Sequence, residues 1–209
     1  MAKLIMFSSL TPFARQEANK VIRMLPEISG TGYLSIGYLP CTDEVYLDQL
    51  TESVMLNCYL ESLGIGTVKP ILDIDEDLGL YDGIFLPGGN TFEILSYLKN
   101  SKFFFKLKTF ADDQNKILIG KSAGSIIMTP TIKIAQFADD NESELDDLRA
   151  LGLVDFEVKP HWNQWKNKKQ VFLDYSLLSN SLIYGIPEGE AIIVNNGDVQ
   201  FTSGIVKIA

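Results

Sequence analysis

A serine between two glycines is the pattern in this sequence best suited to covalent chemistry. Gly120-Lys121-Ser122-Ala123-Gly124 matches G-x-S-x-G and lies between an apolar run that predicts a strand and a segment that predicts a helix. Flanking glycines allow a tight strand-to-helix turn that lifts the serine hydroxyl clear of the backbone, and the helix N-terminus adds positive potential. We therefore predict Ser122 as a nucleophile. The alternative is a serine that only caps the helix.

The same segment also invites a comparison with a phosphate-binding loop. The first glycine of that motif would fall at position 115, which is Asn115. The sequence therefore does not support a nucleotide site here.

A serine nucleophile needs a base, and the chain contains one histidine, His161. His161 follows a predicted strand that ends at Pro160, so we expect it at the carboxyl edge of the sheet, beside the serine turn. The alternative is a hydrogen-bonded histidine near Trp162 and Trp165, two tryptophans that serve only in packing.

The oxyanion that forms on an attacked carbonyl needs hydrogen-bond donors. The backbone N–H of Ala123 is one candidate, and the Gly88-Gly89 pair offers another because a chain without Cβ atoms can approach a substrate closely. The pair could equally be an ordinary tight turn. Asn90, followed by Glu93 three residues later, predicts the start of a helix at Thr91.

The elements that must position these residues alternate along the chain. Short apolar runs separated by longer amphipathic stretches predict parallel strands with crossover helices. Strands are expected at 4–7, 33–39, 68–74, 83–86, 116–119, 156–160, 183–186, 191–194 and 199–201. Helices are expected at 12–26, 43–63, from 91, 101–115, 125–128 and 166–178. We expect the C-terminal strands to be antiparallel and to join the same sheet, and the acidic stretch 138–147 to be a surface loop.

Length and composition restrict the class of protein. The 209 residues predict one domain over 1–209, and 46% hydrophobic with 22% charged residues predict a folded globular chain. A net charge of -9 disfavours nucleic acid and anionic membranes as partners. Cys41 and Cys58 are too few for a disulfide scaffold and lack metal-ligand spacing, which favours a cytoplasmic protein without a metal. No apolar run reaches the roughly 18 residues of a spanning helix.

Four segments, in order, resemble the signature of the dipeptidase E family of serine peptidases, which includes aspartyl dipeptidases and, more distantly, cyanophycinases. They are 86–92 (LPGGNTF), 120–125 (GKSAGS), Pro160-His161 and 186–189 (IPEG). The resemblance implies a class I glutamine amidotransferase-like α/β fold, a three-layer sandwich with a mainly parallel central sheet.

The resemblance also implies roles for individual residues. Ser122 would be the nucleophile, His161 its base and Glu188 the acid that orients the imidazole. The implied oxyanion donors are Gly89 and Ala123, and the implied substrate-binding positions are Gly88 and Asn90. No cofactor is implied. Glu188 has an alternative interpretation as an exposed turn residue.

The chain departs from aspartyl dipeptidases at three places. The position of a candidate acid some fifteen residues after the nucleophile is Phe137, with Asp139 and Asp140 nearby. Residue 121, often aromatic in close relatives, is lysine. The arginine-bearing segment that grips the substrate aspartate is not recognisable; the nearest cations, Lys166, Lys168 and Lys169, also fit a solvated helix face.

The expected function is hydrolysis of small peptides through an acyl-enzyme on Ser122 by a monomer or homodimer. Three alternatives stay open: a non-catalytic ligand-binding or regulatory protein of the same fold, an esterase or amidase that acts on a non-peptide substrate, and an α/β-hydrolase esterase. The last shares G-x-S-x-G but usually places its histidine late in the chain.

Overall fold

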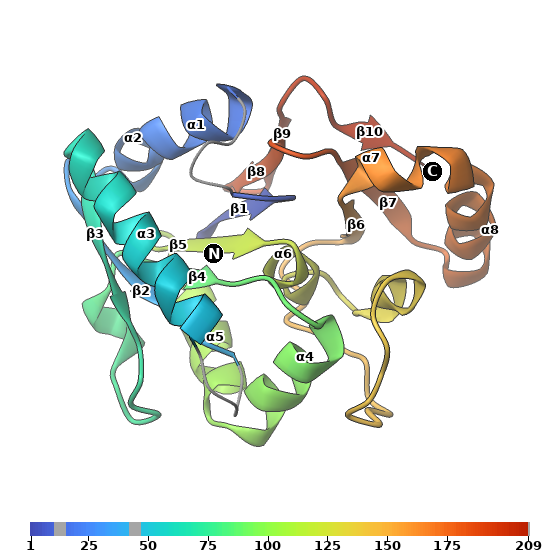
Figure 1. Cartoon of the computed structure of the whole chain (residues 1–209), viewed down its shortest axis with the longest axis horizontal. Helices are drawn as coiled ribbons and strands as arrows, with labels where there is room; N and C mark the ends of the chain where they lie inside the picture. Colours follow the sequence, from blue (N-terminus) through green and yellow to red (C-terminus); the bar gives the residue numbers. More distant parts are fainter. Residues whose placement is uncertain (11–15, 42–46, 209) are drawn as a thin grey trace.

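A central sheet with helices on both faces forms the body of the molecule (Figure 1). The computed structural model describes residues 1–10, 16–41 and 47–208. Within them the sheet has seven strands in the order β3-β2-β4-β5-β1-β8-β9. Their bounds are β1 Lys3–Phe7, β2 Leu34–Tyr38, β3 Gly66–Pro70, β4 Gly83–Leu86, β5 Ile117–Lys121, β8 Ala191–Asn195 and β9 Asp198–Phe201. The first five in this order are parallel, and β8 and β9 add an antiparallel edge.

The central strands are largely apolar because helices cover both of their faces. All four residues of β4 are buried, as are the last four of β1. Continuous apolar runs of this kind are typical of parallel strands, whose crossover helices exclude water from both faces. The mainly parallel sheet expected from the sequence is confirmed.

One face of the sheet is covered by α1 (Gln16–Arg23), α2 (Leu25–Ser29) and α3 (Leu47–Leu63). Ile5 and Phe7 of β1 point into this layer, where they pack in one cluster with Ile22 and Leu60 of the helices. Leu4 and Met6 point to the opposite face, since side chains alternate along a strand.

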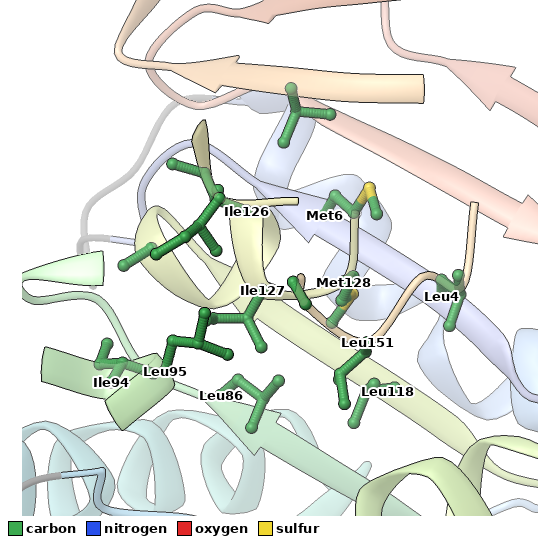
Figure 2. Packing of buried hydrophobic residues seen from close by; sticks show 14 of the residues in the cluster. Leu4, Met6, Leu86, Ile94, Leu95, Leu118, Ile126, Ile127, Met128 and Leu151 are labelled. Atoms are coloured by element: carbon green, nitrogen blue, oxygen red, sulfur yellow. The ribbon is translucent and has the colours of Figure 1, made fainter. Parts of the chain in front are cut away.

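The opposite layer contains α4 (Thr91–Asn100), α5 (Phe103–Ala111) and α6 (Ala123–Ile127). Figure 2 shows Leu86 of the sheet next to Leu95 and Ile127 of these helices, and Leu4, Met6 and Leu118 belong to the same buried cluster. Two helical layers around a sheet make the three-layer sandwich that the sequence predicts.

A second, smaller sheet lies beside the sandwich, on the right in Figure 1. It has the order β10-β7-β6, with β6 (Phe156–Pro160) parallel to β7 (Leu182–Ile186) and β10 (Val206–Lys207) antiparallel to β7. The connection from β6 to β7 contains α7 (Trp162–Trp165), a 3₁₀ turn η3 (Lys166–Lys168) and α8 (Lys169–Ser179).

This sheet corrects the expectation that all C-terminal strands join the central sheet. The β8–β9 hairpin does so, but it occupies the free edge of β1, and β6 and β7 therefore pair with each other. Trp162 lies directly on Gly185, where an added Cβ would come within 2.6 Å of the indole. The absence of a side chain at Gly185 thus lets α7 pack closely on β7.

Several element bounds differ from the expectations. The strand expected at 68–74 is β3, which ends at Pro70 because proline lacks a ladder donor and the Asp73 carboxylate then accepts from the N–H of Asp75 in a turn. The helix expected at 101–115 ends at Ala111 for a similar reason, since Asp113 accepts from Asn115 N–H. Two short 3₁₀ turns, η1 (Leu78–Leu80) and η2 (Lys133–Phe137), were not expected.

The first two expected helices are described only in part. Residues 12–15 of the helix expected at 12–26 lie outside the described residues, and the rest divides into α1 and α2. Residues 43–46 of the helix expected at 43–63 also lie outside them. In the part of the chain that the structure describes, no helix is long and apolar enough to cross a membrane.

Candidate active site

Ser122 occupies a strained turn between the end of β5 and the start of α6. Its backbone has φ 52° and ψ -113°, a conformation that costs a residue with a side chain on the order of 1–3 kcal/mol. Its N–H donates to the Phe7 carbonyl at 2.9 Å, and its side chain makes no capping hydrogen bond to α6. The interpretation of Ser122 as a helix cap is therefore wrong, because the hydroxyl contacts the His161 imidazole and makes no hydrogen bond to the helix terminus.

The glycines around Ser122 are required by close packing. A Cβ at Gly120 would lie 2.6 Å from the Gly124 carbonyl, and one at Gly124 would lie 2.3 Å from the carbonyl oxygen of Leu86 in β4. The buried Ser125 hydroxyl lies 2.8 Å from the Phe7 carbonyl oxygen and so ties the turn to β1. The turn is thus held by backbone contacts with two neighbouring strands.

His161 reaches the serine from the smaller sheet. Its Nε2 lies 2.8 Å from Ser122 Oγ. The residue follows β6 and adopts a left-handed conformation with φ 58°. Its backbone N–H donates to the Ser8 hydroxyl at 2.8 Å, just beyond the end of β1. His161 therefore lies beside the serine turn as expected, although its strand is not part of the central sheet.

Glu188 lies on the other side of the imidazole. Its Oε1 is 2.5 Å from Nδ1 of His161, and its N–H donates to the side chain of Asn163 at 2.8 Å. The two residues meet because β6 and β7 are parallel and Pro160 pairs with Ile186, so both follow the same sheet edge. The interpretation of Glu188 as a merely exposed turn residue does not fit its half-buried side chain. A carboxylate at Nδ1 holds the tautomer whose Nε2 accepts from a serine hydroxyl.

The turn at Gly88-Gly89 faces the serine across a small cavity, which we call the catalytic cavity. It measures about 240 Å³ and is lined by Ser8, Ser9, Leu10, Gly88, Gly89, Lys121, Ser122 and His161. Gly89 has φ 149°, a conformation that side chains disfavour. Ala123 is the first residue of α6, where a backbone N–H has no acceptor within the helix. These are the N–H groups predicted as oxyanion donors.

Asn90 has both ends of its side chain engaged within the protein. Its oxygen accepts from the N–H groups of Phe92 and Glu93 at 2.9 and 3.3 Å, which confirms the helix start at Thr91, and its nitrogen donates to the Asp140 carbonyl at 2.9 Å. Asn90 does not line the catalytic cavity, and its role in substrate binding stays a prediction.

The acidic stretch 138–147 has a structural role that the sequence did not reveal. The Asp139 carboxylate accepts from Thr91 N–H at 2.9 Å and from the Thr91 hydroxyl at 2.5 Å. Phe137 packs edge-on against Phe172 and Tyr175. Asp139 is therefore engaged with the N-terminus of α4, and the carboxylate beside the imidazole is that of Glu188.

Sequence reasoning missed a second set of hydrogen-bonded polar side chains next to the serine. Lys121 forms an ion pair with Glu52 of α3, and the Tyr38 hydroxyl donates to the other oxygen of Glu52 at 2.7 Å. Burial, together with the Glu52 carboxylate, raises the pKa of Tyr38 far above its ordinary value, so this hydroxyl remains a donor. The sequence offered one sign of this ion pair, the lysine itself. Helix α3 carries several acidic residues, and only the packed fold shows that Glu52 is the one that meets Lys121.

The three lysines named as the nearest cations to the expected substrate site are exposed, as expected for a solvated helix face. They are Lys166, Lys168 and Lys169.

The arrangement of a strained serine, an imidazole and a carboxylate on an α/β sandwich defines a serine hydrolase site, and the comparisons narrow the class. Residues 4–202 match the family model described as Peptidase family S51. The peptidase Lmo0363 of Listeria monocytogenes is 34% identical over 149 residues, which cover 69% of this chain and 71% of that protein. Peptidase E of Shewanella amazonensis is 28% identical over 168 residues, covering 76% and 66% of the two chains.

Solved structures agree with these matches. A Listeria monocytogenes EGD-e protein assigned to peptidase E superposes with a TM-score of 0.67 at 28% identity over 97% of this chain and 98% of that one. A peptidase from an acI-B1 actinobacterium shares the fold, with a TM-score of 0.70 at 17% identity over 99% and 90%. The chain belongs to peptidase family S51. It is a serine-type peptidase, and the resemblance to the dipeptidase E family is confirmed.

Proposed function

We propose that the protein hydrolyses small peptides through an acyl-enzyme on Ser122, with His161 as general base and Glu188 as the acid that orients the imidazole. The observation that carries this proposal is the unbroken series of contacts from Ser122 Oγ to His161 Nε2 and from His161 Nδ1 to Glu188 Oε1. Each contact is within hydrogen-bond distance, as a base and its orienting group require.

The reaction follows from these contacts. His161 takes the proton of the Ser122 hydroxyl as Oγ attacks the scissile carbonyl, and the N–H groups of Gly89 and Ala123 stabilise the oxyanion. His161 then passes the proton to the leaving amine, and a water molecule, activated by the same imidazole, releases the acyl group. Loss of one oxyanion donor typically lowers turnover about 10²- to 10³-fold. None of these steps requires a metal or an organic cofactor.

The dimensions of the site favour short substrates. The catalytic cavity, at about 240 Å³, lies below the roughly 300–1,000 Å³ typical of small-molecule sites, so it holds only the atoms around the scissile bond. We further propose that residues 1–209 act as one domain in the cytoplasm, as a monomer or homodimer. Both cysteines are free thiols, as in a reducing compartment.

Labelling with a fluorophosphonate, combined with a dipeptide hydrolysis assay, tests the proposal. Wild-type protein should be labelled and active, and Ser122→Ala should lose both labelling and at least about 10³-fold in turnover while folding normally. Ser203→Ala is the matched control, because Ser203 lies in an exposed turn. A Ser122→Ala variant that retains wild-type turnover would overturn the serine mechanism. Labelling without hydrolysis of any peptide would favour an ester or a non-peptide amide as substrate.

A further inference from the structure

A second cavity adjoins the catalytic cavity on the side of α1 and α3. We call it the lateral cavity. It measures about 300 Å³, and Ile22 of α1, Leu56 of α3 and Phe85 of β4 line it. Phe85 is fixed by stacking on Tyr38 with ring centroids 5.2 Å apart. This volume lies at the lower end of the range for small-molecule sites, so it suits one amino-acid side chain with its backbone.

Of the residues that the structure describes, two line both cavities, Leu10 and Lys121. The Lys121 side chain crosses the space between them, because it starts beside Ser122, passes Gly88 and ends at Glu52 on α3. A Cβ at Gly88 would lie 3.0 Å from Lys121 Cε, which shows how closely the lysine follows the oxyanion turn. The lateral cavity therefore borders the catalytic cavity, with the Lys121 side chain between them.

The position of the histidine sets which part of a substrate each cavity receives. His161 lines the catalytic cavity but not the lateral cavity. The leaving amine must stay near His161, which protonates it. The acyl part of the substrate then extends away from His161, toward Lys121 and the lateral cavity.

On the basis of the proposed function, we propose that the lateral cavity binds the side chain of the substrate's acyl residue and selects a large apolar one, such as leucine, methionine or phenylalanine. Its walls are mainly aliphatic and aromatic, with Met55 and the ring of Tyr59 completing them. Burial of one further methylene in such a pocket improves kcat/KM by roughly 10- to 200-fold.

The charges around the lateral cavity disfavour an acidic side chain. Among the lining residues that the structure describes, Asp48 and Glu52 supply two carboxylates and Lys121 the one cation, which already pairs with Glu52. A substrate carboxylate would lose water against apolar walls and meet an excess of negative charge. The inferred substrate class therefore differs from that of aspartyl dipeptidases, which bind an acidic side chain.

A set of dipeptides that differ only in the first residue tests this inference. We expect kcat/KM for Leu-Ala and Met-Ala to exceed that for Ala-Ala by at least about 10-fold, with Asp-Ala the poorest substrate. A higher kcat/KM for Asp-Ala than for Leu-Ala would overturn the inference while leaving the serine mechanism intact.

A variant that fills the lateral cavity supplies the second measurement. Met55→Trp should lower kcat/KM for Leu-Ala at least about 10-fold relative to Ala-Ala, because indole occupies the space of the substrate side chain. Met55 is 44% exposed, so the fold should accept the change, which circular dichroism verifies. The matched control is Val54→Trp, since Val54 is 60% exposed on the same helix and does not line the cavity.

The outcomes separate this inference from the proposed function. An unchanged Leu-Ala to Ala-Ala ratio in folded Met55→Trp, or an equal change in Val54→Trp, would contradict the inference alone. Absence of both fluorophosphonate labelling and hydrolysis in wild-type protein would contradict the proposed function, and the inference with it.

Discussion

At the scale of single residues, the site depends on one imidazole whose two nitrogens have different partners. Nε2 faces the serine, and Nδ1 faces Glu188, a carboxylate whose side chain is 28% exposed. Because each nitrogen has its own partner, separate substitutions distinguish proton transfer from orientation of the ring.

Replacement of His161 removes the proposed base. The chain contains no other imidazole that could accept the serine proton. We expect His161→Gln to fold normally and to lose at least about 10³-fold in kcat. Steady-state kinetics measure the loss, and circular dichroism checks the fold. If the variant keeps near wild-type kcat, another group, such as Lys121, is the base.

Replacement of Glu188 should weaken turnover without abolishing it. We expect Glu188→Gln to fold normally and to lose roughly 10- to 1,000-fold in kcat, less than the about 10⁴-fold measured in a buried triad, since water can reach this partly exposed carboxylate and replace it. Glu190→Gln, whose carboxylate instead accepts from Gly204 N–H, should keep near wild-type kcat. If Glu188→Gln keeps wild-type kcat, Ser122 and His161 act as a dyad that does not need the carboxylate. A loss equal to that of Ser122→Ala would make Glu188 indispensable.

At the scale of elements, β4, β5 and α6 approach one another so closely that side chains are excluded between them. Gly124 shows this most clearly, because an added Cβ would lie 2.3 Å from the Leu86 carbonyl. Flexible side chains can move aside, whereas a strand carbonyl cannot, so we expect Gly124→Ala to lower the free energy of unfolding by at least about 3 kcal/mol.

Urea denaturation checks the Gly124 prediction against a glycine in open space. Gly32 has no atom within 4 Å of an added Cβ and no positive φ, so Gly32→Ala should change stability by less than about 1 kcal/mol. Equal stability of the two variants would contradict the packing argument.

Strand β6 contains a buried lysine that the proposed chemistry does not use. Lys159 is 2% exposed, and its ammonium lies 4.4 Å from the centre of the Trp165 ring. Burial lowers the pKa of Lys159 to about 8, and the charge of Asp139 opposes this only in part. Because the folded pKa lies below the unfolded value, the unfolded chain holds more protons between about pH 8 and 10.5, and stability rises with pH across that window.

Lys159→Met should therefore stabilise the protein at neutral pH. We expect the free energy of unfolding at pH 7 to rise by about 1–3 kcal/mol, and the gain over wild type to shrink as pH increases from 8 to 10.5. Urea denaturation at pH 7 and 10 measures both. Lys168→Met is the matched control, because Lys168 lies over the same ring at 4.9 Å but is exposed. A gain of the same size at both pH values would contradict the assignment to Lys159.

At the scale of the whole molecule, the features predicted from sequence were those with local signals. The apolar runs of β1, β4 and β5 and the glycines around Ser122 are local, and they predicted the mainly parallel sheet and the position of the serine turn. The partner of a strand is not a local property. The sequence of β6, FEVKP, alternates apolar and charged residues, unlike the apolar run of β4, but this alternation does not indicate which strand is its partner.

The same distinction explains the residues that were missed. Glu52 meets Lys121, and Asp139 meets Thr91, across 69 and 48 positions of sequence, so only the packed fold selects them among many acids. Sequence reasoning also missed Ser8. Nothing in the sequence indicates that a serine after a strand accepts a hydrogen bond from the backbone N–H of His161, 153 positions away.

The contact between Ser8 and His161 also has a consequence for the timing of activity during synthesis. The site joins Ser8, just beyond the first strand, to Glu188, so a ribosome must add residue 188 before all the side chains of the site can meet. A nascent chain contains the proposed nucleophile once residue 122 has been added, but His161 and Glu188 follow only later. The proposed activity can therefore begin only after the segment that contains Glu188 has left the ribosome and folded.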